Sequence, residues 1–272
     1  MRISVLGCGW LGFPLAQHLL KKDFDVKGST TSKDKLPQIS QAGIDSYLIE
    51  LPTSLTDPNI DSFWNTDILF LNIPPGRGNK NVLTEYPEMV QGVVNRVKQN
   101  PDTWIIFASS TSVYSETGGI TSEDDAKPGT ASRPSGEAIL ASEAILRESD
   151  MDYTILRFGG LYGYGRHPVN HLSGKQNLKS PCKPVNLVHQ SDCVRVVDEI
   201  IQQKRLNKIY NVVSDGHPPR KEFYRSAAKH FNLPLPQFGP PEGIQYRVVS
   251  NQKLKNDLNF SFSYPNPMDH TP

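Results

Sequence analysis

Cysteine is scarce in this sequence. Its 272 residues include three cysteines, Cys8, Cys182 and Cys193. An odd number without any Cys-x-x-Cys spacing argues against a disulfide framework and against a thiolate zinc site. We therefore expect three reduced thiols and no metal site. Most of the histidines also share no metal-ligand spacing: His18, His171, His217, His230 and His270.

Long apolar runs and an excess of one charge sign are also missing. No run of about 18 apolar residues is present, which argues against a membrane-spanning helix. The 29 lysines and arginines are balanced by 28 acids. With a net charge of +1, the protein has no strong positive field that would attract nucleic acid or anionic membranes. Residues 1–7 contain no apolar signal region with a cleavage site. We expect a cytoplasmic protein whose partner is a small-molecule substrate; the pattern specifies no oligomeric state.

Short apolar segments typical of strands alternate with amphipathic segments typical of helices. The expected strands are residues 3–6, 25–29, 47–51, 68–73, 104–108, 153–157 and 209–213. The expected helices are residues 10–21, 82–98, 191–204 and 219–231. This alternation predicts an α/β fold, a Rossmann doubly wound parallel sheet with helices on both faces.

The composition of the chain changes after about residue 160, where short segments rich in glycine and proline begin. Such loops gather at the carboxyl edge of a parallel sheet, where ligands bind. We predict an NAD(P)-binding Rossmann domain over residues 1–160 and a small C-terminal substrate-binding lobe over residues 161–272. The lobe is expected to be discontinuous, with about residues 185–213 returning to the Rossmann domain.

A glycine-rich turn, GCGWLG at residues 7–12, follows the first strand and opens the first helix. In such a turn Gly7 allows the tight bend, Gly9 lets the backbone approach a pyrophosphate, and Gly12 lets the helix pack closely on the strand. The helix N-terminus adds N–H donors for the phosphates. The alternative is that the glycines only shape a turn. The residues expected to bind the dinucleotide here are Gly7, Gly9, Trp10, Leu11 and Gly12.

The end of the second strand indicates which dinucleotide binds. An NAD site usually offers a carboxylate to the ribose 2′-hydroxyl, but here Thr30, Thr31, Ser32 and Lys33 precede the first acid, Asp34. Hydroxyls and an ammonium suit a 2′-phosphate, so NADP is favoured and NAD stays possible. Lys33 could instead be only a solvated residue that opens the next helix. Two residues after the fourth strand are also expected to line the cofactor site: Ile73 and Pro74.

Several further motifs occur in the order and spacing of one known family. They are residues 107–114 (FASSTSVY), 133–136 (RPSG), 156–163 (LRFGGLYG), 186–189 (NLVH) with Asp192, 210–212 (YNV) and 249–254 (VSNQKL). The chain therefore resembles the extended short-chain dehydrogenase/reductases, the NAD-dependent epimerase/dehydratase superfamily, over about residues 1–265. It looks like an atypical bacterial branch.

The resemblance implies a catalytic role for Ser110, but the family's catalytic tyrosine and lysine are absent from this sequence. In that family a serine at this position polarises the reacting oxygen, a tyrosine is the general acid/base, and a lysine four residues later lowers the tyrosine pKa and holds the nicotinamide ribose. The PSG segment, aligned through the helix expected at 140–146, puts Ser135 at the tyrosine and Ile139 at the lysine. The usual mechanism therefore cannot be carried over.

Two residues after the sixth strand are candidates for the missing chemistry. His167 could donate a proton near neutral pH and Arg166 could bind an anionic substrate group, although both could also be part of a solvated loop. Four other polar residues are expected to have structural roles. Tyr114 and Tyr162 could line the cavity, but tyrosines in such positions more often pack with satisfied hydroxyls. Arg157 should form an ion pair, and Asp192 should cap a helix near residue 193.

Two hypotheses for function follow. The first is an NADP-dependent oxidoreductase or epimerase-like enzyme that acts on a small polar or nucleotide-sugar substrate, with Ser110, His167 and Arg166 in its active site. The second is a non-catalytic NADP-binding sensor or scaffold protein of the same fold. The missing tyrosine and lysine favour the second, whereas Ser110, the glycine-rich turn and the elaborated C-terminal lobe favour the first.

Overall fold

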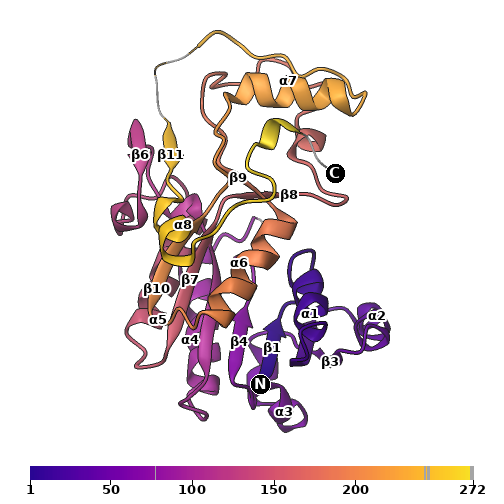
Figure 1. Cartoon of the computed structure of the whole chain (residues 1–272). Helices are drawn as coiled ribbons and strands as arrows, with labels where there is room; N and C mark the ends of the chain where they lie inside the picture. The colour runs from indigo at the N-terminus through magenta and orange to yellow at the C-terminus, as the bar shows by residue number, and fades with distance from the viewer. Residues whose placement is uncertain (77, 242, 244–245, 270–272) are drawn as a thin grey trace. The chain divides into compact units, whose positions relative to one another are not determined.

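The structure is a computed structural model that describes residues 1–76, 78–241, 243 and 246–269 (Figure 1). Its backbone contacts divide the chain into two compact units. Unit 1 comprises Met1–Val113, Lys127–Arg157 and Ile200–Ile209, and unit 2 comprises Tyr114–Ala126, Phe158–Glu199 and Tyr210–Pro272. The roles of cofactor domain and substrate lobe stay predictions.

A seven-stranded sheet forms the centre of the fold, with the strand order β3-β2-β1-β4-β5-β7-β10. Its strands are β1 (Arg2–Leu6), β2 (Asp25–Thr30), β3 (Asp45–Leu48), β4 (Ile68–Leu71), β5 (Trp104–Ser110), β7 (Tyr153–Phe158) and β10 (Lys208–Val212). β1 pairs in parallel with β2 on one side and β4 on the other. The order therefore reverses at β1, which is the switch point where doubly wound folds bind their ligands.

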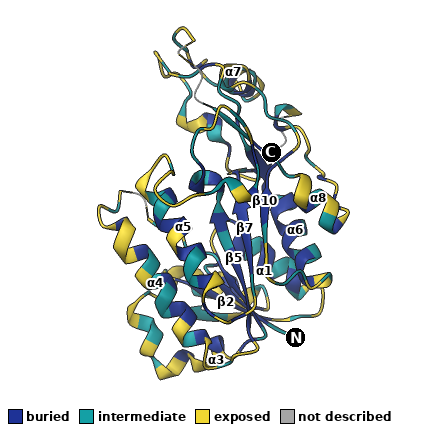
Figure 2. Cartoon of the chain, turned by 90° about the vertical axis from the view of Figure 1, so that its left-hand side faces the viewer, coloured by how far each residue is buried: buried dark blue, intermediate teal, exposed yellow. Residues whose placement is uncertain are grey.

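The strands are buried because helices cover the sheet on both faces. All four residues of β4 are buried, as are Ile3, Val5 and Leu6 of β1, which is typical of parallel strands between two helical layers. Figure 2 shows α4 and α5 on one face and α1 on the other. The helices of unit 1 are α1 (Gly12–Leu20), α2 (Leu36–Gln41), α3 (Asp61–Trp64), α4 (Val82–Val97) and α5 (Pro134–Arg147).

Unit 2 contains shorter elements. Two small parallel sheets pair β6 (Gly119–Thr121) with β11 (Arg247–Val249) and β8 (Gly160–Tyr162) with β9 (Leu187–His189). Its helices are α7 (Arg220–His230), α8 (Gln252–Leu258) and most of α6 (Gln190–Gln202). α7 packs through Phe223, Ala227 and Ala228 against Tyr162, Leu187 and Val169.

The predicted α/β class and the doubly wound parallel sheet are confirmed. Each predicted strand and helix is present, with ends that differ from the prediction by a few residues. The third strand is displaced most: β3 begins at Asp45 and ends at Leu48, and Ile49 makes a last backbone hydrogen bond to Thr30. Among the described residues, no helix combines the length and the apolar character needed to cross a membrane.

Candidate functional site

The first and last glycines of the turn after β1 are required by close contacts inside the protein itself. Gly7 has φ +105°, and a Cβ on it would lie 2.4 Å from the Asn72 carbonyl oxygen. A Cβ on Gly12 would lie 2.1 Å from the Gly7 carbonyl oxygen. Since carbon atoms do not approach oxygen so closely, a side chain at either position would push the backbone apart. These two glycines shape the turn.

Gly9 is different, because nothing in the protein requires it to be a glycine. A Cβ built on Gly9 has no atom within 4 Å, its φ lies outside the left-handed region, and the residue is exposed. The open space above Gly9 is a cradle that a side chain would fill. A pyrophosphate lying against the backbone is the ligand for which a doubly wound fold needs such a cradle.

The start of α1 fits the same ligand. Leu11 occupies the N-cap position, makes no side-chain hydrogen bond to the helix, and no acid lies in the first turn. The first N–H groups of a helix have no partner within the helix, and they carry the positive end of its dipole. In α1 the N–H groups of Phe13 and Leu15 donate to the carbonyl oxygens of Gly9 and Leu11, and Pro14 has no N–H. The N–H groups suited to phosphate oxygens are therefore those that precede Phe13, beside the Gly9 cradle. Trp10 is half-buried next to it.

Two side chains that the sequence did not single out hold the turn. The Asn72 side-chain amide donates to the Gly7 carbonyl oxygen at 2.9 Å. The Gly7 N–H donates to the Ser29 hydroxyl at 2.9 Å, and the Cys8 N–H donates to the Ser29 carbonyl oxygen at 2.7 Å. Ser29 lies near the carboxyl end of β2, and Asn72 directly follows β4. These two strands are the neighbours of β1 in the sheet. Their position at this edge is the signal that could have identified them.

Cys8, the second residue of the turn, has a buried side chain, so its thiol is not an accessible nucleophile. A Cβ on Gly28 of β2 would lie 2.6 Å from the Cys8 Sγ, so the thiol uses the space that Gly28 leaves. Burial raises the pKa of Cys8 to about 12. Its role is packing between β1 and β2.

The end of β2 carries hydroxyls and a lysine, with no carboxylate among residues 26–33. Thr30 is buried, and its hydroxyl accepts the Ser32 N–H at 3.2 Å. Thr31 and Lys33 are exposed, and Lys33 begins a short 3₁₀ helix that ends at Lys35.

Ile73 and Pro74 follow β4 at the same edge of the sheet. Ile73 is half-buried and Pro74 is exposed. The Tyr86 hydroxyl of α4 donates to the Ile73 carbonyl oxygen at 2.9 Å, so this segment is held against a helix. Tyr86 is buried, which raises its phenol pKa above the usual range.

Ser110 ends β5, which lies beside β4 in the sheet and four positions from the edge strand β3. Its half-buried hydroxyl oxygen accepts the Ser112 N–H at 3.1 Å. That bond uses an oxygen lone pair and not the hydroxyl proton. Ser110 can therefore donate its proton to a carbonyl or alkoxide oxygen.

α5 begins close to the segment that follows Ser110. A Cβ on Gly136 would lie 2.2 Å from the Ser112 carbonyl oxygen, so the first turn of α5 touches this segment through its backbone. Ser135 lies in that first turn, half-buried, and Ile139 is buried one turn later. The structure thus brings Ser135 to the segment of Ser110, where the family has its tyrosine, but neither Ser135 nor Ile139 supplies an acid or a cation.

A buried ion pair contacts Ser109, the residue before Ser110. Arg157 of β7 bonds Glu143 of α5 with Nη2 to Oε2 at 2.6 Å, and both side chains are at most 3% exposed. The Ser109 hydroxyl donates to Glu143 Oε1 at 2.5 Å. The prediction that Arg157 is an ion-pair partner is confirmed, and the pair ties three neighbouring elements of unit 1 together.

Arg166 and His167 lie in unit 2, where they follow β8. Arg166 is exposed, and its backbone pairs with Gly163 in a tight antiparallel bridge. His167 is only 9% exposed, and its Nδ1 accepts the Val169 N–H at 3.2 Å. Its ring stacks on Phe223 at 5.5 Å and packs against Phe231 at 4.9 Å between centroids. His167 is therefore packed, whereas Arg166 lies in an exposed part of the loop. Nε2 is the nitrogen that could donate a proton, and it is buried as well, so it can donate only to a group that enters this cluster of rings.

Two further polar residues of unit 2, Tyr114 and Asp192, have structural contacts. Tyr114 is fully buried and its hydroxyl donates to Asn211 Oδ1 at 2.6 Å, which confirms its predicted packing role. Asp192 is fully buried, but it does not cap a helix beginning at residue 193, because α6 already begins at Gln190. Its carboxylate instead accepts the N–H groups of Ser263 and Tyr264.

A parallel sheet with a phosphate-type turn at its switch point defines a dinucleotide-binding Rossmann protein. The family model described as NAD(P)H-binding matches residues 7–191, and the chain belongs to this family. It is 31% identical to Protein YeeZ of Escherichia coli strain K12 over 271 residues, which are 98% of this chain and 97% of that protein.

Solved structures share the fold. A Methylobacillus flagellatus protein assigned to the NAD-dependent epimerases/dehydratases is 25% identical, with a TM-score of 0.77 over 98% of this chain and 95% of that one. The UDP-glucuronic acid 4-epimerase of Bacillus cereus, in complex with NAD, is 18% identical, with a TM-score of 0.79 over 100% of this chain and 97% of that one. The predicted resemblance to the epimerase/dehydratase superfamily is confirmed.

Proposed function

We propose that the protein is an NADP-dependent oxidoreductase or epimerase-like enzyme that acts on a small polar or nucleotide-sugar substrate. The observation that carries the proposal is the open cradle at Gly9 beside the uncapped N-terminus of α1. When bound there, the cofactor supplies or accepts a hydride. The UDP-glucuronic acid 4-epimerase with this fold supports the sugar-nucleotide class.

In this proposal each residue has a defined task. The backbone of residues 7–12 holds the pyrophosphate, and Thr31, Ser32 and Lys33 hold the 2′-phosphate of the adenosine ribose. Ile73 and Pro74 line the same edge of the sheet. Ser110 donates a hydrogen bond to the reacting oxygen of the substrate. His167 donates the proton through Nε2, and Arg166 binds an anionic group of the substrate.

A second function is favoured by one feature of α5. Ser135 and Ile139 stand where the family's tyrosine and lysine are expected, and the chemistry of those groups is missing. The alternative is a non-catalytic NADP-binding sensor or scaffold. Single-turnover oxidation of bound NADPH by a panel of carbonyl compounds, read at the nicotinamide absorbance, separates the two. Oxidation by any member of the panel supports an enzyme, and unchanged NADPH with every member supports the sensor.

NADPH should bind more tightly than NADH. A charge-assisted hydrogen bond between Lys33 and the 2′-phosphate contributes about 1.5–3 kcal/mol. Lys33→Ala should therefore lower the preference for NADPH by about tenfold or more, since 1.4 kcal/mol corresponds to a factor of ten. Fluorescence titrations of both cofactors at fixed salt measure the ratio. Lys35→Ala, an exposed lysine in the same 3₁₀ turn, is the matched control. A preference for NADH would contradict the assignment.

Removal of the His167 proton donor should lower turnover by about 10²- to 10⁴-fold, the usual contribution of a general acid. His167→Asn keeps an acceptor for the Val169 N–H at the place of Nδ1, whereas His167→Gln keeps a polar group at the place of Nε2. Both variants lack an acid, so both should lose turnover and the alkaline limb of the pH profile, where a general acid loses its proton, while NADPH affinity is nearly unchanged. Wild-type turnover in a folded His167→Asn protein would end this role.

A further inference from the structure

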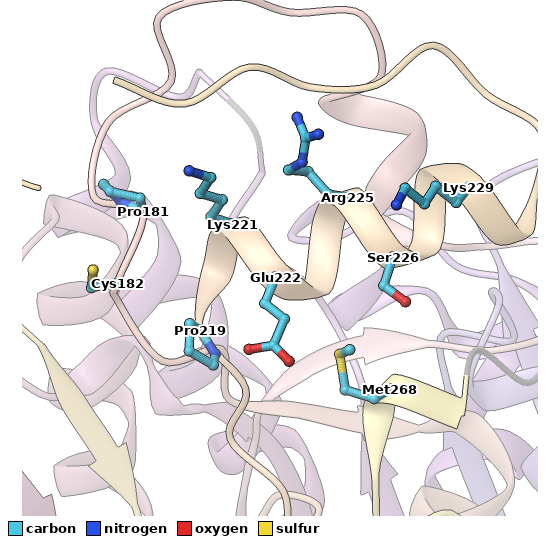
Figure 3. Close-up of a pocket in the computed structure, with 9 residues that line it drawn as sticks. All are labelled: Pro181, Cys182, Pro219, Lys221, Glu222, Arg225, Ser226, Lys229 and Met268. Carbon is cyan, nitrogen blue, oxygen red and sulfur yellow. The ribbon is translucent and has the colours of Figure 1, made fainter. Parts of the chain in front are cut away.

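Unit 2 has a pocket along one side of α7, with a volume of about 510 Å³ (Figure 3). This volume lies within the range of about 300–1,000 Å³ that is usual for small-molecule sites. The pocket is built from α7 together with residues of two other segments, Pro181–Cys182 and Met268. All of its lining residues belong to unit 2.

One edge of the pocket is a row of positive charge. Lys221, Arg225 and Lys229 are four residues apart, so they lie on one face of α7. Arg225 is half-buried, and its Nη1 donates to the Pro236 carbonyl oxygen at 3.3 Å, which fixes the guanidinium. In the part of the chain that the structure describes, no ion pair joins these three cations to a carboxylate. Their mutual repulsion is therefore offset best by an anion from outside the chain.

The other edge of the pocket has a different character. Glu222 and Ser226 follow the cations by one residue, and Figure 3 shows their side chains directed toward Pro219 and Met268. A carboxylate repels phosphate but accepts hydrogen bonds from hydroxyl groups. The proline ring and the methionine side chain offer apolar contact for a carbon skeleton. A ligand that fits both edges has an anionic end and a body with hydroxyl groups.

We propose that this pocket binds a small phosphate ester of a polyhydroxy compound, such as a sugar phosphate, with its phosphate on Lys221, Arg225 and Lys229 and its hydroxyls on Glu222. The phosphate takes the charged edge because each of the three cations can give it a charge-assisted hydrogen bond. The site uses no residue of the turn at 7–12. It therefore stands or falls independently of the proposed cofactor, whose binding is titrated separately.

Cys182 provides the measurement, because it lines the pocket and is the exposed thiol of the three. Cys8 and Cys193 are buried, and burial raises the pKa of both thiols, so neither reacts rapidly. The rate of Cys182 alkylation by neutral N-ethylmaleimide, followed by intact mass, is compared with and without ligand. The ratio of the two rates cancels any change in the thiol's own reactivity between variants, and Cys182→Ser identifies the labelled site.

Glucose 6-phosphate should slow alkylation by about tenfold at ten times its dissociation constant, because the free fraction falls by that factor. Glucose at the same concentration should have no effect, and inorganic phosphate at matched ionic strength should protect less. No protection by glucose 6-phosphate, or equal protection by glucose, would overturn the proposal. Equal protection by inorganic phosphate would also overturn it and leave an adventitious ion only.

Two sets of variants test the two edges. Lys221→Gln combined with Lys229→Gln removes two exposed charges, and should abolish protection by glucose 6-phosphate. Lys175→Gln combined with Lys208→Gln removes two exposed lysines outside the pocket and should preserve it. Glu222→Gln should reduce the advantage of glucose 6-phosphate over inorganic phosphate, because a neutral amide accepts weaker hydrogen bonds from the sugar hydroxyls than a carboxylate does. Full protection in the first double variant, with a native melting temperature, contradicts the site.

Discussion

Gly9→Val should abolish NADPH binding and leave the unliganded protein as stable as the wild type. The valine side chain would occupy the cradle above Gly9, where the chain itself has no atom within 4 Å of the added Cβ. Loss of two hydrogen bonds to a charged phosphate, at about 1.5–3 kcal/mol each, weakens binding by about 100-fold or more. A fluorescence titration with NADPH and a thermal melt without cofactor measure the two quantities.

The neighbouring glycines give this experiment its contrast. Gly7→Ala and Gly12→Ala should lower the melting temperature of the unliganded protein, because their Cβ atoms would collide with carbonyl oxygens at 2.4 Å and 2.1 Å. Gly119→Val is the matched control, since Gly119 also has open space and an unstrained φ but lies in β6 of unit 2. NADPH binding by Gly9→Val at wild-type affinity would remove the turn from the cofactor site.

Arg157→Met should destabilise the protein by about 3–5 kcal/mol, because it leaves the Glu143 carboxylate buried without its cation. Replacement of both partners, as Arg157→Met with Glu143→Leu, should recover most of that loss, since two packed apolar side chains no longer require desolvation of a charge. Urea denaturation of the wild type, both single variants and the double variant gives the coupling free energy.

A solvent-accessible pair serves as the control for the buried one. Lys255 and Asp215 form an ion pair at 2.9 Å with side chains 32% and 40% exposed. Lys255→Met should cost about 1 kcal/mol or less, because water screens such pairs. A similarly small loss for Arg157→Met would mean that the Glu143 site admits water or that Glu143 becomes neutral.

The sequence predicts the large sheet well because its strands are continuous apolar segments buried on both faces. β4 is an example, since its whole length reads as apolar and all of it is buried. The strands of the two small sheets were not predicted, because β6, β8, β9 and β11 have three residues each. So short a segment has no measurable periodicity, and its pairing depends on a partner far along the chain.

The candidate site also has a part that the sequence predicts and a part that only the folded chain reveals. The turn at residues 7–12 is a local motif, so its place in the sequence was enough to find it. Asn72 and Ser29, which hold Gly7, come from separate strands that only the folded sheet brings together. The burial of His167 could not be foreseen for a similar reason: Phe223 and Phe231, the rings that cover it, belong to α7 and the residue after it.

Gly28 and Cys8 constrain one another in a way that should be visible in evolution. With the Cys8 Sγ only 2.6 Å from the place of a Cβ on Gly28, neither residue can gain volume unless the other loses it or the turn moves. Descendants of a common ancestor should therefore substitute these two positions together, as a covarying pair. A lineage that acquires alanine at position 28 is expected to carry glycine or another compensating residue at position 8. Substitution at position 28, which has no chemical role, is therefore limited by the geometry of the neighbouring turn.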